Sequence, residues 1–201
     1  MGYVSACLSV ITVLQCLKQA QWPEANPVLL LPGMVRKDGT PHEYASNSMA
    51  QLLSMPRDKL DNHLPKEVGL PLSLTNDQFF RVWESIPRLK VEGSQTSSKT
   101  LRVHIRRLNH GYTNNRLLYA PRFPKSQQES WFVLASGPND QRLLALQRVT
   151  LSGRGGGDAS VQLDIPAFDG DSVMVRVLSD GWRGVDEEKQ VKWKRNHVVE
   201  T

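Results

Sequence analysis

The chain has 201 residues, of which 39% are hydrophobic and 22% charged, enough for one or two small domains with their own cores. Its 14 glycines and 12 prolines are close to average usage, and its net charge is only +5, which together exclude collagen-like, low-complexity and wholly disordered chains. The two cysteines lie in one apolar segment, which excludes a disulfide scaffold and favours a reducing compartment.

The first apolar segment, residues 3–17, is interrupted by polar residues and follows no basic residue, so we expect neither a signal peptide nor a membrane anchor. Its apolar residues recur every three or four positions and predict a helix to about Gln21, ended by Pro23. If upstream helices are missing, one apolar face of this helix should be exposed and the chain should aggregate. That face is Val4, Leu8, Ile11 and Leu14.

The chain remains helical in pattern as far as Arg88. Helices are predicted over His42–Leu53, over Pro56–Leu64, and from Thr75 to a stop at Pro87. The last of these should bury one apolar side, formed by Phe79, Phe80, Val82 and Trp83.

From Leu89 the apolar residues alternate with polar ones, which is the period of a β-strand. Turn signals separate seven or eight such runs, the most apolar being Trp131 to Ala135. The pattern predicts an antiparallel β-sandwich, with Trp131 filling its core.

Motifs for catalysis are missing. There is no phosphate-binding loop with a terminal Lys-Ser or Lys-Thr, and residues 152–157 are interpreted as a flexible glycine-rich hairpin. No serine elbow exists, and no histidine lies at metal-ligand spacing. The acidic run at residues 186–188 is interpreted as a solvated turn. We therefore predict no catalytic residue and no metal site.

One binding feature stands out. Arg102, His104 and Arg106 should point to the same side of one strand, and Arg107 adjoins them. Together with Arg116, Arg122 and Lys125 they could form a basic face that binds nucleic-acid phosphates. The alternative, which we favour from the sequence, is an ordinary solvated face of the sandwich.

Several segments resemble a known family. They are A-P-R-F-P-K-S at residues 120–126, E-S-W-F-V-L at 129–134, and S-D-G-W-R-G-V-D at 179–186. Upstream, Q-A-Q-W at 19–22 and P-V-L-L-L-P at 27–32 match the same family. The chain is similar to the Sec-family module that closes each cassette of the large tandem superfamily-two helicases. Its segments resemble most those of the activating signal cointegrator type, and next those of the large spliceosomal type.

Helical periodicity followed by an all-β run predicts an α+β fold that divides near residue 88, independently of the resemblance, which implies the same fold. A helical remnant over residues 1–88, the end of a helical bundle and a helical hairpin, would precede an immunoglobulin-like, C2/fibronectin-like antiparallel β-sandwich over residues 89–201. Trp131, Asp180, Gly184 and Asp186 would be structural motif residues, the two aspartates bracketing a turn in which Gly181 and Gly184 allow positive φ.

The resemblance also implies a parent helicase that unwinds nucleic acid 3′-to-5′ with ATP and magnesium, in the nucleus and cytosol. This chain itself has no position matching the ATP-binding motifs, so it would hold no cofactor. Since such modules close long polypeptides, we expect a C-terminal fragment, an incomplete gene or a short isoform.

Two functions remain open. The first is the terminal scaffold module of such a helicase, with roles such as DNA alkylation repair and rescue of stalled ribosomes. Its partners would be the motor domains and cointegrator-complex subunits, with weak binding of single-stranded nucleic acid and no membrane contact. The second is a free-standing protein-interaction adaptor that does not bind nucleic acid. The sequence does not decide between DNA and RNA as the substrate.

Overall fold

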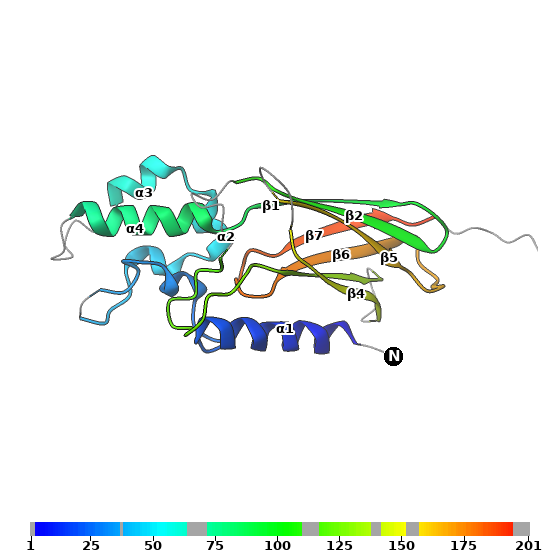
Figure 1. The fold of residues 1–201 in the computed structure, drawn as a ribbon, viewed down its shortest axis with the longest axis horizontal. Coiled ribbons are helices and arrows are strands. Elements are labelled where there is room, and N and C mark those ends of the chain that lie inside the picture. The colour runs from blue at the N-terminus through cyan, green and yellow to red at the C-terminus, as the bar shows by residue number, and fades with distance from the viewer. Residues whose placement is uncertain are drawn as a thin grey trace, which may run out of the picture.

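The computed structural model describes residues 3–36, 38–63, 72–109, 117–137, 142–151 and 157–194. It contains a long N-terminal helix, a group of short helices and two β-sheets (Figure 1). Arg116 lies outside these residues. So do residues 152–156 of the loop that the sequence predicts to be glycine-rich and flexible.

The first helix, α1, spans Val4–Gln19 and ends close to where the sequence predicts. Ala20 adopts a left-handed conformation there, with φ of 48°, and its N–H donates to the carbonyls of Cys16 and Leu17. Both cysteines of the chain are free thiols.

The single helix predicted over His42–Leu53 is wrong. After a 3-10 turn, η1 (Pro27–Leu30), the chain forms a second 3-10 turn, η2 (Glu43–Ser46), and only then α2 (Met49–Ser54). The break arises because Ser48 is extended and caps α2: its hydroxyl accepts from the Gln51 N–H, and the Gln51 side chain accepts from the Ser48 N–H.

Two further helices follow, as predicted. Helix α3 spans Arg57–His63, and α4 spans Leu72–Ser85, beginning three residues before the expected start at Thr75. The predicted apolar side of α4 is buried, with Phe79 only 1% exposed. Figure 1 shows α2, α3 and α4 gathered beyond one end of the sandwich.

Seven strands form two antiparallel sheets in the described part of the chain. The first sheet has the order β1 (Leu89–Gln95), β2 (Thr100–Arg107), β5 (Asp158–Asp164). The second has the order β4 (Leu143–Val149), β3 (Trp131–Ser136), β6 (Ser172–Ser179), β7 (Glu187–Lys192). The predicted α+β fold with an antiparallel β-sandwich is confirmed.

The position of β4 defines the sandwich type. In constant-type immunoglobulin domains the fourth strand joins the first sheet. Here β4 pairs with β3 in the second sheet, which is the C2/fibronectin-like arrangement. Because β4 and β5 belong to different sheets, they do not pair with each other as the predicted hairpin at residues 152–157 would require, and residues 152–156 themselves lie outside the described part of the chain.

The two sheets enclose the main core. Trp131, Val133 and Ala135 of β3 are fully buried and face the first sheet, as the alternation of strand side chains requires. The buried cluster is continuous from Val28 in η1 to Trp193 after β7. Whether residues 1–88 and 89–201 behave as separate domains stays a prediction.

Helix α1 forms a third layer on the outer face of the second sheet (Figure 1). Leu134 and Leu178 point away from the core of the sandwich, yet they are 0% and 7% exposed. Val4 and Ile11 of α1 are similarly buried. The expectation that Val4, Leu8, Ile11 and Leu14 form an exposed face is therefore wrong: the sandwich covers Val4 and Ile11, and Leu8 and Leu14 are half-buried.

The turn after β6 contains glycine at two positions that differ in their surroundings. Gly184 has φ of 78° and fits the prediction of a positive φ, whereas Gly181 is absent from the positive-φ positions. A Cβ at Gly181 would overlap the buried side chain of Leu118, so a larger residue there would require Leu118 to move.

The Gly184→Ala substitution tests how much the turn depends on this conformation. The alanine would have to keep the left-handed backbone conformation of Gly184, and its Cβ would lie 3.1 Å from Cβ of Met49. We expect the free energy of unfolding to fall by roughly 2 kcal/mol. Gly39→Ala is the matched control, since Gly39 has φ of 83° but nothing within 4 Å, and should cost roughly 1 kcal/mol. Equal losses in chemical denaturation would show that the Met49 contact contributes nothing.

Candidate functional site

Helix α1 attaches to the sandwich through polar side chains. Gln15, Lys18 and Gln19 are 4%, 8% and 1% exposed and face the turn after β6. They lie at positions i, i+3 and i+4, so they share one face of the helix. The buried side of α1 thus carries these three polar residues in addition to Val4, Ile11 and Cys16, whereas a surface helix usually buries apolar residues alone.

Asp180 is the centre of this attachment. It is fully buried, and its Oδ2 accepts from Lys18 Nζ at 2.7 Å, from Arg148 Nη2 at 2.6 Å and from the Ser130 hydroxyl. Burial disfavours the ionised carboxyl group, but these three donors outweigh it and hold the pKa of Asp180 below its ordinary value. The ion pairs therefore connect α1, β4 and the start of β3 through one carboxylate.

Two glutamines complete the attachment by donating to backbone carbonyls of the turn. Gln15 Nε2 donates to the carbonyls of Ser179 and Trp182, at 2.7 and 3.0 Å. Gln19 Nε2 donates to the carbonyl of Gly181 at 2.9 Å. These bonds satisfy carbonyls that the tight turn would otherwise bury without partners.

The C-terminal end of α1 is held by two arginines. Arg122 Nη1 donates to the carbonyl of Ala20 at 3.3 Å, and Arg183 Nη1 donates to that of Trp22 at 3.0 Å. Cations are favourable there because the carbonyl end of a helix carries partial negative charge. From the sequence, Arg122 is predicted to lie in a basic face. In the structure its guanidinium is hydrogen-bonded to the C-terminal end of α1.

The opposite side of α1 carries a stripe of exposed apolar side chains. Val10, Val13 and Leu17 are 68%, 53% and 67% exposed and lie three and four residues apart, on one face. Trp22, beyond the helix end, is 80% exposed. We call Val10, Val13, Leu17 and Trp22 the α1 stripe. Large apolar residues aligned in this way are typical of an interaction surface.

The strand face predicted to be basic carries charges of both signs. Arg102 and Arg106 are exposed and His104 is half-buried, all on one side of β2, as predicted. Arg106 is opposite Asp158 on β5 and Lys90 on β1, and His104 is opposite Glu92 on β1. The acidic cross-strand neighbours offset the cations, and this favours a solvated polar face over a phosphate-binding one.

Arg107 does not contribute to this face. It is 7% exposed and points to the other side, where its Nη1 donates to Glu129 at 2.7 Å and its Nη2 to the Ser85 carbonyl. This buried pair joins the end of α4 to β2 and to the segment before β3. Its role in the structure is to connect elements of the fold.

The motif residues predicted to be structural all lie at or near the α1 attachment. Trp131 is in the core, Asp180 is the ion-pair centre, and Gly184 has positive φ. Oδ1 of Asp186 accepts from the Ser179 N–H at 3.2 Å and so spans the turn. Desolvation of its carboxyl group, together with the nearby carboxylates of Glu188 and Glu187, raises the pKa of Asp186 to about 6.

Within the described residues, no group of three or more His, Cys, Asp or Glu could hold a metal ion. No helix in that part of the chain is long and apolar enough to cross a bilayer.

Comparison with known proteins agrees with this geometry. The family model described as the Sec63 Brl domain matches residues 1–192. The chain belongs to this family. Its motif segments are the ones that meet at the α1 attachment: Gln19 from the upstream segment contacts Gly181 of the downstream one.

The curated relatives of this Sec63 Brl domain are helicases. The chain is 25% identical over 195 residues to the DExH-box ATP-dependent RNA helicase DExH14 of Arabidopsis thaliana, covering 95% of this chain and 9% of that protein. It is 25% identical over 169 residues to the RQC trigger complex helicase SLH1 of Saccharomyces cerevisiae, covering 74% of this chain and 8% of that protein.

A third relative is the U5 small nuclear ribonucleoprotein 200 kDa helicase of Mus musculus, 23% identical over 198 residues, with 93% of this chain and 9% of that protein covered. The chain thus spans under a tenth of the length of these three relatives.

Sequence reasoning missed the residues that attach α1. Lys18, Gln15 and Arg148 were not singled out, although a signal existed. Gln15, Lys18 and Gln19 lie at helical spacing near the end of a largely apolar helix, which indicates a face with specific hydrogen-bond partners. The partner of Lys18, Asp180, could not be identified from the sequence because it lies 162 residues away.

Neutralising the Asp180 carboxylate should weaken the attachment of α1 to the sandwich. We expect Asp180→Asn to lower the free energy of unfolding by about 3–5 kcal/mol, because it leaves the ammonium of Lys18 buried without a counter-charge. Lys18→Met should cost less, since Arg148 and Ser130 still compensate Asp180. Lys90→Met, which breaks an exposed pair with Glu92, is the control and should cost at most about 1 kcal/mol. Chemical denaturation distinguishes the three.

The raised pKa of Asp186 predicts a stability loss with rising pH. The folded state binds more protons than the unfolded one between the ordinary pKa of 3.8 and about 6, so stability falls as pH rises through that interval. Asp186→Asn keeps the acceptor for the Ser179 N–H and should flatten this part of the pH profile. A profile with the same slope in the variant would contradict the assignment.

The two carboxylates on the strand face, Glu92 and Asp158, lead us to expect weak nucleic-acid binding there. The double variant Arg102→Gln, Arg106→Gln should change affinity for single-stranded RNA by less than about twofold, with an unchanged salt slope. A tenfold loss accompanied by a shallower salt slope in fluorescence anisotropy would identify this face as a phosphate-binding surface.

Proposed function

We propose that this chain is the terminal scaffold and interaction module of an ATP-dependent 3′-to-5′ nucleic-acid helicase, and that it docks onto the rest of that machine without supplying the motor. The family match and the helicase names of the curated relatives support this proposal. So does the short span of the chain relative to those proteins.

The observation that carries the proposal is the α1 stripe. A helix that fixes itself to the sandwich through buried ion pairs and glutamines has already used its polar face. Its apolar face is then available to a second surface, and burial of Val10, Val13, Leu17 and Trp22 would stabilise docking by several kcal/mol, at roughly 25 cal/mol per Å². The partner we propose is the motor-bearing part of the parent helicase.

ATP and magnesium belong to that motor. The residues of this chain do not fit either group, since the sequence lacks a phosphate-binding loop and the described residues contain no metal-binding cluster. The contribution of the module is therefore mechanical: it presents a rigid surface at a fixed orientation.

A finer assignment is to the activating signal cointegrator type, with roles in DNA alkylation repair and ribosome quality control in the nucleus and cytosol. The A-P-R-F-P-K-S segment supports this type. One relative is named as an RQC trigger complex helicase, which fits the ribosome role. Subunits of the cointegrator complex would be further partners.

The size of the native polypeptide tests the proposal. An antibody raised against residues 89–201 should detect a band many times larger than 22.6 kDa in the native source. A dominant band near 22.6 kDa would instead make the chain a stand-alone product. The α1 stripe would then serve an adaptor function with a separate protein.

Changing the α1 stripe should abolish docking and leave the fold intact. The triple variant Val10→Gln, Val13→Gln, Leu17→Gln alters only exposed side chains, so the melting temperature should change little. Copurification with the separately expressed remainder of the native polypeptide should fall at least about tenfold, because each lost aliphatic contact contributes on the order of 1 kcal/mol.

The control for this experiment changes three exposed aliphatic residues elsewhere. Val35→Gln, Leu108→Gln and Leu146→Gln remove similar apolar area from surfaces outside α1. Loss of copurification in this control but not in the stripe variant would place the docking surface away from α1.

A further inference from the structure

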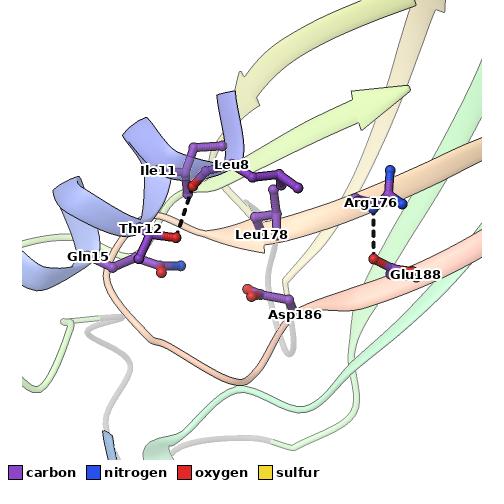
Figure 2. Close-up of a pocket in the computed structure, with 8 residues that line it drawn as sticks. All are labelled: Leu8, Ile11, Thr12, Gln15, Arg176, Leu178, Asp186 and Glu188. Carbon is purple, nitrogen blue, oxygen red and sulfur yellow. Dashed lines mark hydrogen bonds and ion pairs between the residues drawn. The ribbon is translucent and has the colours of Figure 1, made fainter. Parts of the chain in front are cut away.

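A hollow of about 270 Å³ lies between α1 and the outer face of the second sheet. Figure 2 shows its two walls: Leu8, Ile11, Thr12 and Gln15 from α1, opposite Leu178 of β6 and Asp186 before β7. It lies on the sandwich-facing side of α1 and is therefore distinct from the α1 stripe. The docking surface proposed above does not account for it.

The hollow combines an apolar wall with unbalanced negative charge. Leu8, Ile11 and Leu178 supply the apolar part. At the other side, Glu188 already pairs with Arg176, its Oε1 accepting from Nε at 2.7 Å. Asp186 has the Ser179 N–H as a donor, and within the described residues no lysine or arginine pairs with it.

The carboxyl group of Asp186 is oriented toward the interior of the hollow. In Figure 2 it points from the β7 side toward Gln15 of α1. One oxygen accepts from Ser179, which leaves the second oxygen to receive a donor from outside the chain. Arg176 cannot supply it readily, since its guanidinium donates to Glu188 and to the Ser136 hydroxyl.

We propose that this hollow receives an arginine side chain of a protein partner, with the guanidinium on Asp186 and the methylene stem against Leu8, Ile11 and Leu178. A guanidinium presents several donors in one plane and can engage the Asp186 carboxylate while remaining near Glu188. Its apolar stem suits the leucine-lined wall, which inorganic cations would leave unfilled.

The electrostatics of the site agree with an absent counter-charge. Close packing and the carboxylates of Glu188 and Glu187 raise the pKa of Asp186 to about 6. A guanidinium in the hollow would oppose both effects and return the pKa of Asp186 toward its ordinary value. Binding should consequently strengthen as pH rises through 6. This inference does not depend on the proposed helicase function.

The test uses the full chain and a minimal probe. N-acetyl-arginine amide is titrated while the methyl signals of Leu8, Ile11 and Leu178 and the carboxyl signal of Asp186 are followed by NMR. The matched probe is N-acetyl-citrulline amide, which has nearly the same shape and no charge. We expect saturable shifts with the arginine probe at about pH 7.5, weaker shifts at about pH 5, and at least fivefold weaker binding of the citrulline probe.

Variants separate recognition from folding. Asp186→Asn should abolish the arginine-specific shifts, whereas Glu24→Gln, which removes an exposed carboxylate elsewhere, should retain them. Thr12→Lys places an ammonium in the hollow from α1 and should both block the probe and lower the pKa of Asp186. It provides an independent test should Asp186→Asn fail to fold.

Three results would overturn the proposal. They are equal responses to arginine and citrulline, retention of the shifts in Asp186→Asn, or no shift at the three hollow-lining residues up to about 100 mM probe, above the range expected for a charge pair with an apolar contact.

Discussion

A single buried carboxylate determines how this molecule is assembled. Asp180 is removed from water, so it must be compensated by cations and hydrogen bonds, or its burial would cost several kcal/mol. Lys18, Arg148 and Ser130 supply that compensation from three separate elements. Their convergence fixes α1 against the second sheet, and the surrounding turn, with its close approach at Gly181, is shaped around the same contact.

This constraint explains why the first helix exposes apolar residues. Because Gln15, Lys18 and Gln19 face the sandwich, the outward side of α1 presents Val10, Val13 and Leu17. An apolar stripe of this kind on a firmly attached helix suits docking to a larger body, since the surface is already ordered and little conformational entropy is lost on binding. The chain is related to helicases more than ten times its length, so the larger body we propose is the remainder of such a protein.

The sequence and the structure agree where a feature is local. The alternation of apolar and polar residues predicted the sandwich and the burial of Trp131, and the S-D-G-W-R-G-V-D motif predicted the turn at Asp180. Both signals are local, because strand alternation and turn formation depend on a few neighbouring residues. Agreement fails where the partner is distant. The exposed side of α1 was assigned wrongly, since only the position of the sheet decides which of two apolar faces is covered. Arg107 was placed with the basic face because its pairing with Glu129 cannot be recognised from spacing.

Amide hydrogen exchange of α1 tests the central claim, that Asp180 holds this helix on the sandwich. The account predicts that Asp180→Asn accelerates exchange across Val4–Gln19 by about two orders of magnitude or more, given the cost of breaking a buried pair, while β3 and β6 remain protected in comparison. Unchanged protection of α1 in the variant, or an equal loss in helix and strands, would contradict it.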